Sequence, residues 1–210
     1  NALVTRGDAA IILHVVLTQS FRIEEPPVPV TLVNAAGVNV NDFLLELRKL
    51  PKQVLDAFNA AGWTYCIDFD YMGGLSKKLN MSCIGATNYS QKTIYISEAS
   101  ATLHEFGHFL DWMLGFPAEY EQLFRAEASA APLRNYAKTD SREYFADCFA
   151  YWVKYAENAN AISLLQECAP MTYRYTKTLI TTAFLSAWLS MARRSTLTSA
   201  APTAMDGPSA

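Results

Sequence analysis

Two of the three histidines in this 210-residue chain, His104 and His108, are separated by four positions. They enclose Glu105 in the run His-Glu-Phe-Gly-His, which matches the HExxH pattern. In a helix of about 3.6 residues per turn, both imidazoles lie on one face and can bind a single zinc ion. Glu105, about 100° further round the helix, can then act as a general base on water beside the metal. The pattern therefore predicts a catalytic zinc site.

A catalytic zinc ion needs three protein ligands and one open position. The metzincin pattern would place a third histidine six residues after His108, but that position is Leu114, and the remaining histidine is His14. We therefore expect a carboxylate, and the best candidate is Glu143 in the run Ser-Arg-Glu-Tyr-Phe-Ala-Asp. Asp147, one helical turn after Glu143, is placed to accept the free ring N–H of a liganding histidine.

Three segments of the chain resemble a known family. They are His-Glu-Phe-Gly-His-Phe-Leu-Asp, Ser-Arg-Glu-Tyr-Phe-Ala-Asp-Cys-Phe-Ala-Tyr and, late in the chain, Cys-Ala-Pro-Met-Thr-Tyr. Together they resemble the catalytic domain of the anthrax lethal factor family, most strongly its small secreted members, the Pro-Pro endopeptidases. The resemblance runs from about residue 50 to about residue 178. It implies a zincin-like (gluzincin) metallopeptidase domain with one Zn²⁺, held by His104, His108 and Glu143.

The resemblance also implies a reaction, the hydrolysis of peptide bonds by a zinc-dependent endopeptidase. Glu105 would be the general base. Tyr136, seven residues before Glu143, would stabilise the oxyanion that develops on the scissile carbonyl. Asp111 matches an aspartate that follows HExxH in the family and would support the ligands together with Asp147.

The substrate implied by the resemblance is an extended peptide or protein. Zincins hold such a peptide by backbone hydrogen bonds along an edge strand, a form of strand addition. We expect this strand at residues 81–87, with Ile84, Gly85 and Ala86 at the rim of the site. Cleavage at proline-containing sites of surface or extracellular proteins is a narrower hypothesis, because it depends on loop shape.

Two alternatives to a secreted, toxin-like endopeptidase stay open. A domain of this fold can act as a catalytically silent protein-binding module, but such a module is expected to lose a ligand or the general base, and Glu105 is present. A cytosolic zinc peptidase that controls a regulator would carry the same motif. The chain shows no signal peptide, so the secreted location rests on the resemblance.

The elements that must position these residues change in character along the chain. Strands are expected first, at residues 9–16, 63–69, 81–88 and 92–96, with Gly73-Gly74 as a break and Gly73 to Lys78 as a loop. Helices are expected at residues 43–49, 51–62, 97–114, 117–128, 141–157 and 170–194. This order predicts one α+β domain over residues 1–194, with a small mixed sheet whose edge strand lies above the HExxH helix, followed by a helical half. Residues 195–210 are expected to form a flexible low-complexity tail.

Composition excludes other classes of protein. Hydrophobic residues make up 51% and charged residues 18%, which is typical of a folded domain. A net charge of -3 gives no cationic excess, so we expect no nucleic-acid partner. The most apolar stretch, Leu179 to Met191, is shorter than the roughly 20 residues of a membrane span. The four cysteines lack the spacing of a metal site, and whether they form disulfides is left open. Separately, we expect the protein to be a monomer.

Overall fold

The computed structural model describes residues 28–180, and their first half is organised around a mixed sheet. Its strands are β1 (Leu32–Asn34), β2 (Thr64–Ile67), β3 (Gly85–Asn88) and β4 (Thr93–Ile96). The spatial order is β1-β2-β4-β3, in which β1, β2 and β4 are parallel and β3 is antiparallel to β4. Among residues 28–180, strand β3 is therefore an edge strand, with no further strand paired to its outer side.

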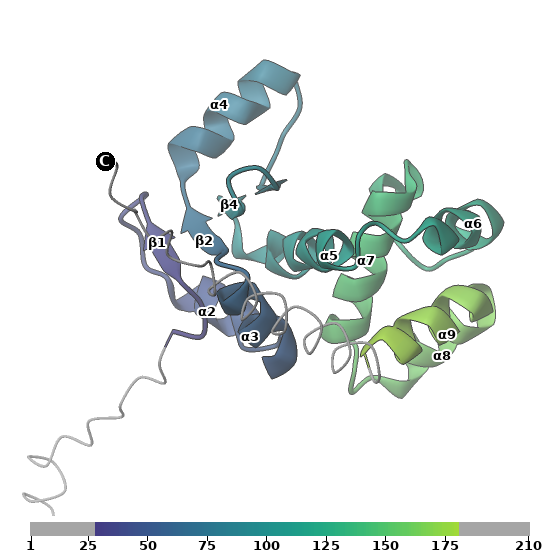
Figure 1. Cartoon of the computed structure of the whole chain (residues 1–210). Helices are drawn as coiled ribbons and strands as arrows, with labels where there is room; N and C mark the ends of the chain where they lie inside the picture. Colours follow the sequence, from purple (N-terminus) through teal and green to yellow (C-terminus); the bar gives the residue numbers. More distant parts are fainter. Residues whose placement is uncertain (1–27, 181–210) are drawn as a thin grey trace, which may run out of the picture.

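Helices surround this sheet and form the second half of the described chain. Beside the sheet lie α2 (Asn41–Leu47), α3 (Lys52–Ala60) and α4 (Phe69–Leu79). A 3₁₀ turn, η1 (Ala99–Ala101), leads into α5 (Thr102–Met113), and then follow α6 (Ala118–Glu127), η2 (Asn135–Lys138), α7 (Ser141–Lys154), α8 (Ala159–Cys168) and α9 (Pro170–Thr178). Figure 1 shows α5 in the middle, between the sheet and the later helices. The predicted α+β architecture is confirmed.

Helix α5 is anchored by aromatic packing on the side opposite its histidines. The ring of Phe58 lies 4.8 Å from that of Phe106 and 5.1 Å from that of Phe109, between centroids. Trp63 packs edge-on against Phe109 at 5.2 Å. All four side chains are buried, and burying each one contributes on the order of 1.5–3 kcal/mol. Because this face is fixed, the histidine face is held in one orientation.

Helices α5 and α7 cross with their backbones in contact at Gly107. A Cβ atom added to Gly107 would lie 2.5 Å from Cα of Ala146 and 2.7 Å from its carbonyl oxygen. No side chain larger than hydrogen fits there without moving a helix. The close crossing brings the first turn of α7, which carries Glu143, next to the histidine face of α5.

The predicted break at Gly73-Gly74 and the predicted loop from Gly73 to Lys78 are wrong, because these residues lie inside α4. Asp68 caps the helix by accepting a hydrogen bond from a backbone N–H of the first turn at 2.8 Å. Asn80 ends it in the left-handed conformation, at φ 52°. A Cβ at either glycine would meet nothing within 4 Å, so both face open space. Their cost of about 1 kcal/mol each relative to alanine does not prevent the helix.

The strand predicted at residues 81–88 is shorter than expected and begins at Gly85. The backbone N–H of Met81 donates to the carbonyl of Ser76 at 3.1 Å, and that of Cys83 donates to Ser76 Oγ at 3.0 Å. These bonds tie residues 81–83 to the end of α4 instead of to the sheet. Ile84 is transitional, since its carbonyl accepts a bond from Ser97 N–H at 2.9 Å.

Helix α8 was not predicted, although Asn158 caps it by accepting a hydrogen bond from the Ala161 N–H at 3.1 Å. Helix α9 begins at Pro170 as predicted. Its predicted continuation to residue 194, the apolar stretch, the tail and the strand predicted at residues 9–16 lie largely or wholly outside the described residues. All four cysteines are free thiols. Within residues 28–180 there is no helix long and apolar enough to cross a membrane.

Candidate metal centre

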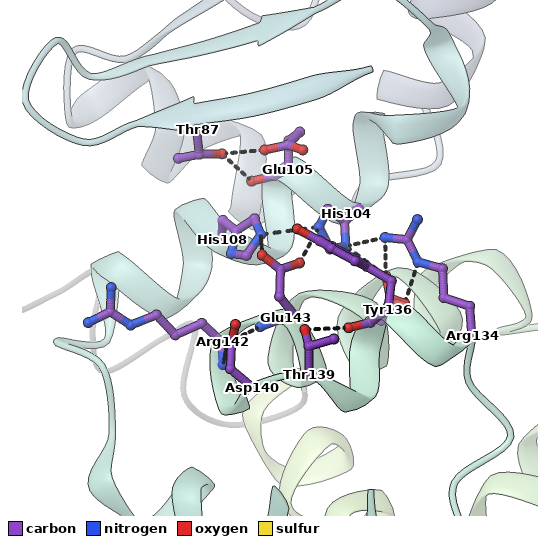
Figure 2. Close-up of polar contacts among 11 residues, drawn as sticks. Thr87, His104, Glu105, His108, Arg134, Tyr136, Thr139, Asp140, Arg142 and Glu143 are labelled. Atoms are coloured by element: carbon purple, nitrogen blue, oxygen red, sulfur yellow. Dashed lines mark hydrogen bonds and ion pairs between the residues drawn. The ribbon is translucent and has the colours of Figure 1, made fainter. Parts of the chain in front are cut away.

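Side chains from α5 and α7 converge at the crossing of these helices (Figure 2). The Nε2 atoms of His104 and His108 are 3.1 Å apart. Glu143 places Oε2 3.1 Å from His104 Nε2 and Oε1 3.5 Å from His108 Nε2. In a tetrahedral site with bonds of about 2.0–2.1 Å, ligand atoms lie about 3.4 Å from one another. The three side chains thus form a triangle of the size that zinc requires.

The electrostatics of this triangle also suit a cation. Nδ1 of His104 lies 2.6 Å from Asp147 Oδ1, which assigns its proton to that contact and turns the Nε2 lone pair towards the centre. Among residues 28–180, Oε2 of Glu143 is buried with no hydrogen-bond partner assigned to it, and the nearest nitrogen is His104 Nε2 at 3.1 Å. Burial alone would lower the pKa of His104, but Asp147 and Glu143 raise it to about 9. The field that attracts a proton to this ring also attracts a metal ion, and two imidazoles with one carboxylate suit Zn²⁺.

An arginine that the sequence analysis missed supports the centre from outside. Arg134 donates two hydrogen bonds to Asp147 through one edge of its guanidinium, from Nε to Oδ2 at 2.6 Å and from Nη2 to Oδ1 at 2.7 Å. Burial opposes ionisation of Asp147, but His104 and Arg134 together keep its pKa below the usual value. Asp147 therefore stays charged and fixes the ring of His104. The sequence analysis could have looked for a basic partner of Asp147, because a buried acid needs one, but nothing in the sequence identifies Arg134 as that partner.

The edge strand β3 lies directly over Glu105. The side chain of Glu105 is buried, and its Oε2 accepts a hydrogen bond from Thr87 Oγ1 at 2.7 Å. A Cβ added to Gly85 would lie 2.6 Å from Glu105 Oε1, so only glycine leaves room for the carboxylate. Burial raises the pKa of Glu105, while both histidines and Thr87 oppose that rise. The sequence analysis predicted the strand that contains Thr87 but not the contact of Thr87 with Glu105.

A cleft of about 550 Å³ opens beside the metal-ligand group, which consists of His104, His108 and Glu143. Ile84 and Gly85 line it, as does Thr87, but Ala86 does not. Successive side chains of a strand point to opposite faces, which explains why Gly85 and Thr87 face the cleft and Ala86 faces away. Ala86 belongs to the edge strand, and its role in substrate binding stays a prediction.

Tyr136 lies in η2 at the mouth of this cleft. Its side chain is half-exposed, its ring centroid is 6.4 Å from that of His104, and Figure 2 shows its hydroxyl directed towards the ligands. Burial and the neighbouring Glu143 raise the pKa of Tyr136 to about 12, so the phenol keeps its proton at neutral pH. It is therefore available as a hydrogen-bond donor in the cleft.

Asp111 is buried on α5 one turn beyond His108. Among residues 28–180 it makes no hydrogen bond to a candidate ligand, and its Oδ2 has no partner. Burial raises the pKa of Asp111 to about 6, although His108 and Arg142 oppose the rise. The role expected of Asp111 in supporting the ligands stays a prediction.

An HExxH helix beneath the antiparallel edge strand of a small mixed sheet, with a carboxylate from a later helix, is the arrangement of a zincin-like domain. The family model described as anthrax toxin lethal factor, N- and C-terminal domain, matches residues 45–179, and the chain belongs to this family. The resemblance inferred from the motifs is confirmed.

A solved structure leads to the same fold. The chain is similar to the Pro-Pro endopeptidase PPEP-2 from Paenibacillus alvei, with a TM-score of 0.56 and 20% sequence identity. The match covers 70% of this chain and 96% of that one. No curated protein matches the chain. At this identity, the likeness to PPEP-2 shows a shared zincin-like fold.

Proposed function

We propose that this chain is a zinc-dependent endopeptidase that hydrolyses peptide bonds in extended protein substrates. The observation that carries the proposal is the triangle of His104, His108 and Glu143, with Glu105 held beside it. The family and the endopeptidase neighbour support a peptidase in general terms. The donor set and the HExxH pattern favour zinc as the metal.

The proposed role of each side chain in the reaction follows from its position in the site. When bound, the zinc ion supplies a Lewis acid that lowers the pKa of water from about 15.7 towards 7. Glu105 accepts the proton of the attacking water and passes it to the leaving amine. Tyr136, protonated at neutral pH, donates a hydrogen bond to the oxyanion on the scissile carbonyl. Asp147 and Arg134 hold the ring of His104 in place throughout.

The proposed substrate is a peptide that adds to the open side of β3. Backbone hydrogen bonds to an edge strand hold an extended chain without selecting its side chains. Cleavage at proline-containing sites and a secreted location are narrower proposals. They rest on the motifs shared with the Pro-Pro endopeptidases. A catalytically silent binding module is less well supported, because it would have no use for a general base oriented by Thr87.

A peptide library tests the proposal. The zinc-loaded wild type is compared with Glu105→Gln, which keeps the size of the side chain but cannot accept the proton. We expect cleavage by the wild type and a loss of at least about 10³-fold in kcat/KM in Glu105→Gln, with zinc content unchanged. Glu119→Gln, at an exposed glutamate on α6, is the matched control and should cleave normally. A wild type that cleaves no peptide, or a Glu105→Gln variant as active as the wild type, would overturn the proposal.

A further inference from the structure

The cleft is lined by two arginines whose circumstances differ. Arg134 and Arg142 lie on opposite sides of the metal-ligand group in Figure 2. Arg134 is committed to Asp147 by two charge-assisted hydrogen bonds. The guanidinium of Arg142 makes no ion pair or hydrogen bond with any residue in the range 28–180. Within the described residues, Arg134 therefore has a carboxylate partner and Arg142 has none.

Arg142 is nevertheless held in place. Its guanidinium carbon lies 4.3 Å from the centroid of the Phe116 ring, a cation–π contact. Phe116 has a left-handed backbone, at φ 54°, which is an outlier for a bulky side chain. The Phe116 ring also meets Tyr89, the residue after β3, edge-on at 5.6 Å. Phe116, in the segment after α5, therefore forms an aromatic platform under Arg142, and Tyr89, next to the edge strand, packs against that ring.

The charge of Arg142 is not explained by the stability of α7. Arg142 lies in the first turn of this helix, where the helix dipole disfavours a cation. Asp140 already caps the helix by accepting the N–H groups of Arg142 and Glu143 at 2.8 and 3.0 Å. Asp111 shares a small pocket with Arg142 but forms no ion pair with it. Arg142 is thus an exposed cation beside the cleft, placed against Phe116 and without an ion-paired acid among residues 28–180, and such a group is suited to bind an acidic ligand.

We infer that Arg142 is a specificity-determining residue that binds the carboxylate of an acidic side chain in the substrate. A guanidinium stacked on a ring keeps its N–H edges free for a bidentate carboxylate. Figure 2 shows the Arg142 side chain pointing away from the metal ligands, on the side of His108. The acidic residue therefore lies near the scissile bond and not at it, within about three residues at about 3.3 Å per extended residue.

This inference rests on the proposed function and adds a substrate class to it, namely peptides with Asp or Glu at one position within about three residues of the cleaved bond. The test uses the zinc-loaded protein and a synthetic decapeptide library, with cleavage sites read by mass spectrometry. The wild type is compared with Arg142→Gln and Arg142→Glu. The control is Arg48→Gln, at an exposed arginine that does not line the cleft.

We expect Asp or Glu to be enriched about tenfold over Asn or Gln at one position by the wild type and by Arg48→Gln. This enrichment disappears in Arg142→Gln, and Arg142→Glu prefers Lys or Arg at the same position, while both variants keep their zinc. If the wild type cleaves without acidic enrichment, or Arg142→Gln retains it, the inference is wrong although the proposed function stands. If the wild type cleaves nothing, the proposed function fails and this inference fails with it.

Discussion

Oγ1 of Thr87 donates a hydrogen bond to Oε2 of Glu105 over 2.7 Å, which joins the edge strand to the proposed general base. The same hydroxyl lies 3.3 Å from the backbone carbonyl of Glu105. Strand β3 therefore orients the carboxylate of Glu105, and its outer edge is the place proposed for the substrate peptide. The position of the base is set by the element that would bind the substrate.

Thr87→Val removes this hydroxyl while keeping the branched shape of the side chain. We expect kcat to fall about 10- to 100-fold with KM nearly unchanged, because a hydrogen bond to a charged group contributes about 1.5–3 kcal/mol. Thr87→Ser keeps the hydroxyl and should recover most of the activity. Steady-state kinetics at equal zinc content measure both effects. A Thr87→Val variant with wild-type kcat would show that the contact does not orient Glu105.

The backbone contact between α5 and α7 predicts a large difference between two glycine substitutions. Gly107→Ala drives a Cβ into the backbone of Ala146, at 2.5 Å, and should lower the free energy of unfolding by about 3 kcal/mol or more. Gly74→Ala, on the open face of α4, should raise it by about 1 kcal/mol. Urea unfolding of the metal-free proteins compares the two. Equal stability of Gly107→Ala and the wild type would contradict the tight crossing.

Arg134→Gln breaks the bidentate contact with Asp147 and leaves that carboxylate with one partner fewer. Because Asp147 orients His104, we expect zinc affinity to fall about 10- to 100-fold. Arg125→Gln is the control, since Arg125 is exposed and pairs with Glu121 one helical turn away. Competition with a fluorescent chelator measures both affinities. Unchanged affinity in Arg134→Gln would mean that Asp147 holds the ring without help.

Zinc binding should depend on pH through His104. In the metal-free protein the pKa of His104 is raised to about 9, so at pH 7 the ring carries a proton that zinc must displace. Affinity is therefore expected to rise by about tenfold per pH unit from pH 7 to 9 and then to level off. The raised pKa also stabilises the metal-free fold below pH 6.5, a contribution lost as pH rises through 9. Calorimetry in buffers of different ionisation enthalpy counts the released proton, and a pH-independent affinity would refute the assignment.

The sequence predicts the candidate metal ligands and the general base better than it predicts the elements and contacts around them. His104, His108 and Glu105 follow from one local motif, and Glu143 follows from the lack of a further histidine near it. Helix α4 was missed because paired glycines usually break a helix, and here a good cap at each end outweighs them.

Contacts between distant segments explain what else was missed. Arg134 reaches Asp147 across 13 positions, and Thr87 reaches Glu105 across 18. The periodicity of the sequence does not show such pairs, because they depend on how the strand, the helices and the segment before η2 pack together. The sequence likewise does not show that Arg142 lacks an ion pair within residues 28–180, because there it is one basic residue among 17.

The most direct test of the account is the zinc content of the purified protein and of Glu143→Ala, measured by mass spectrometry after dialysis against the same weak chelator. Glu119→Ala, which removes an exposed glutamate from α6, is the matched control. The account predicts about one zinc ion per chain in the wild type and in Glu119→Ala, and a loss of most of it in Glu143→Ala. Stoichiometric zinc in Glu143→Ala, or none in the wild type, would contradict it.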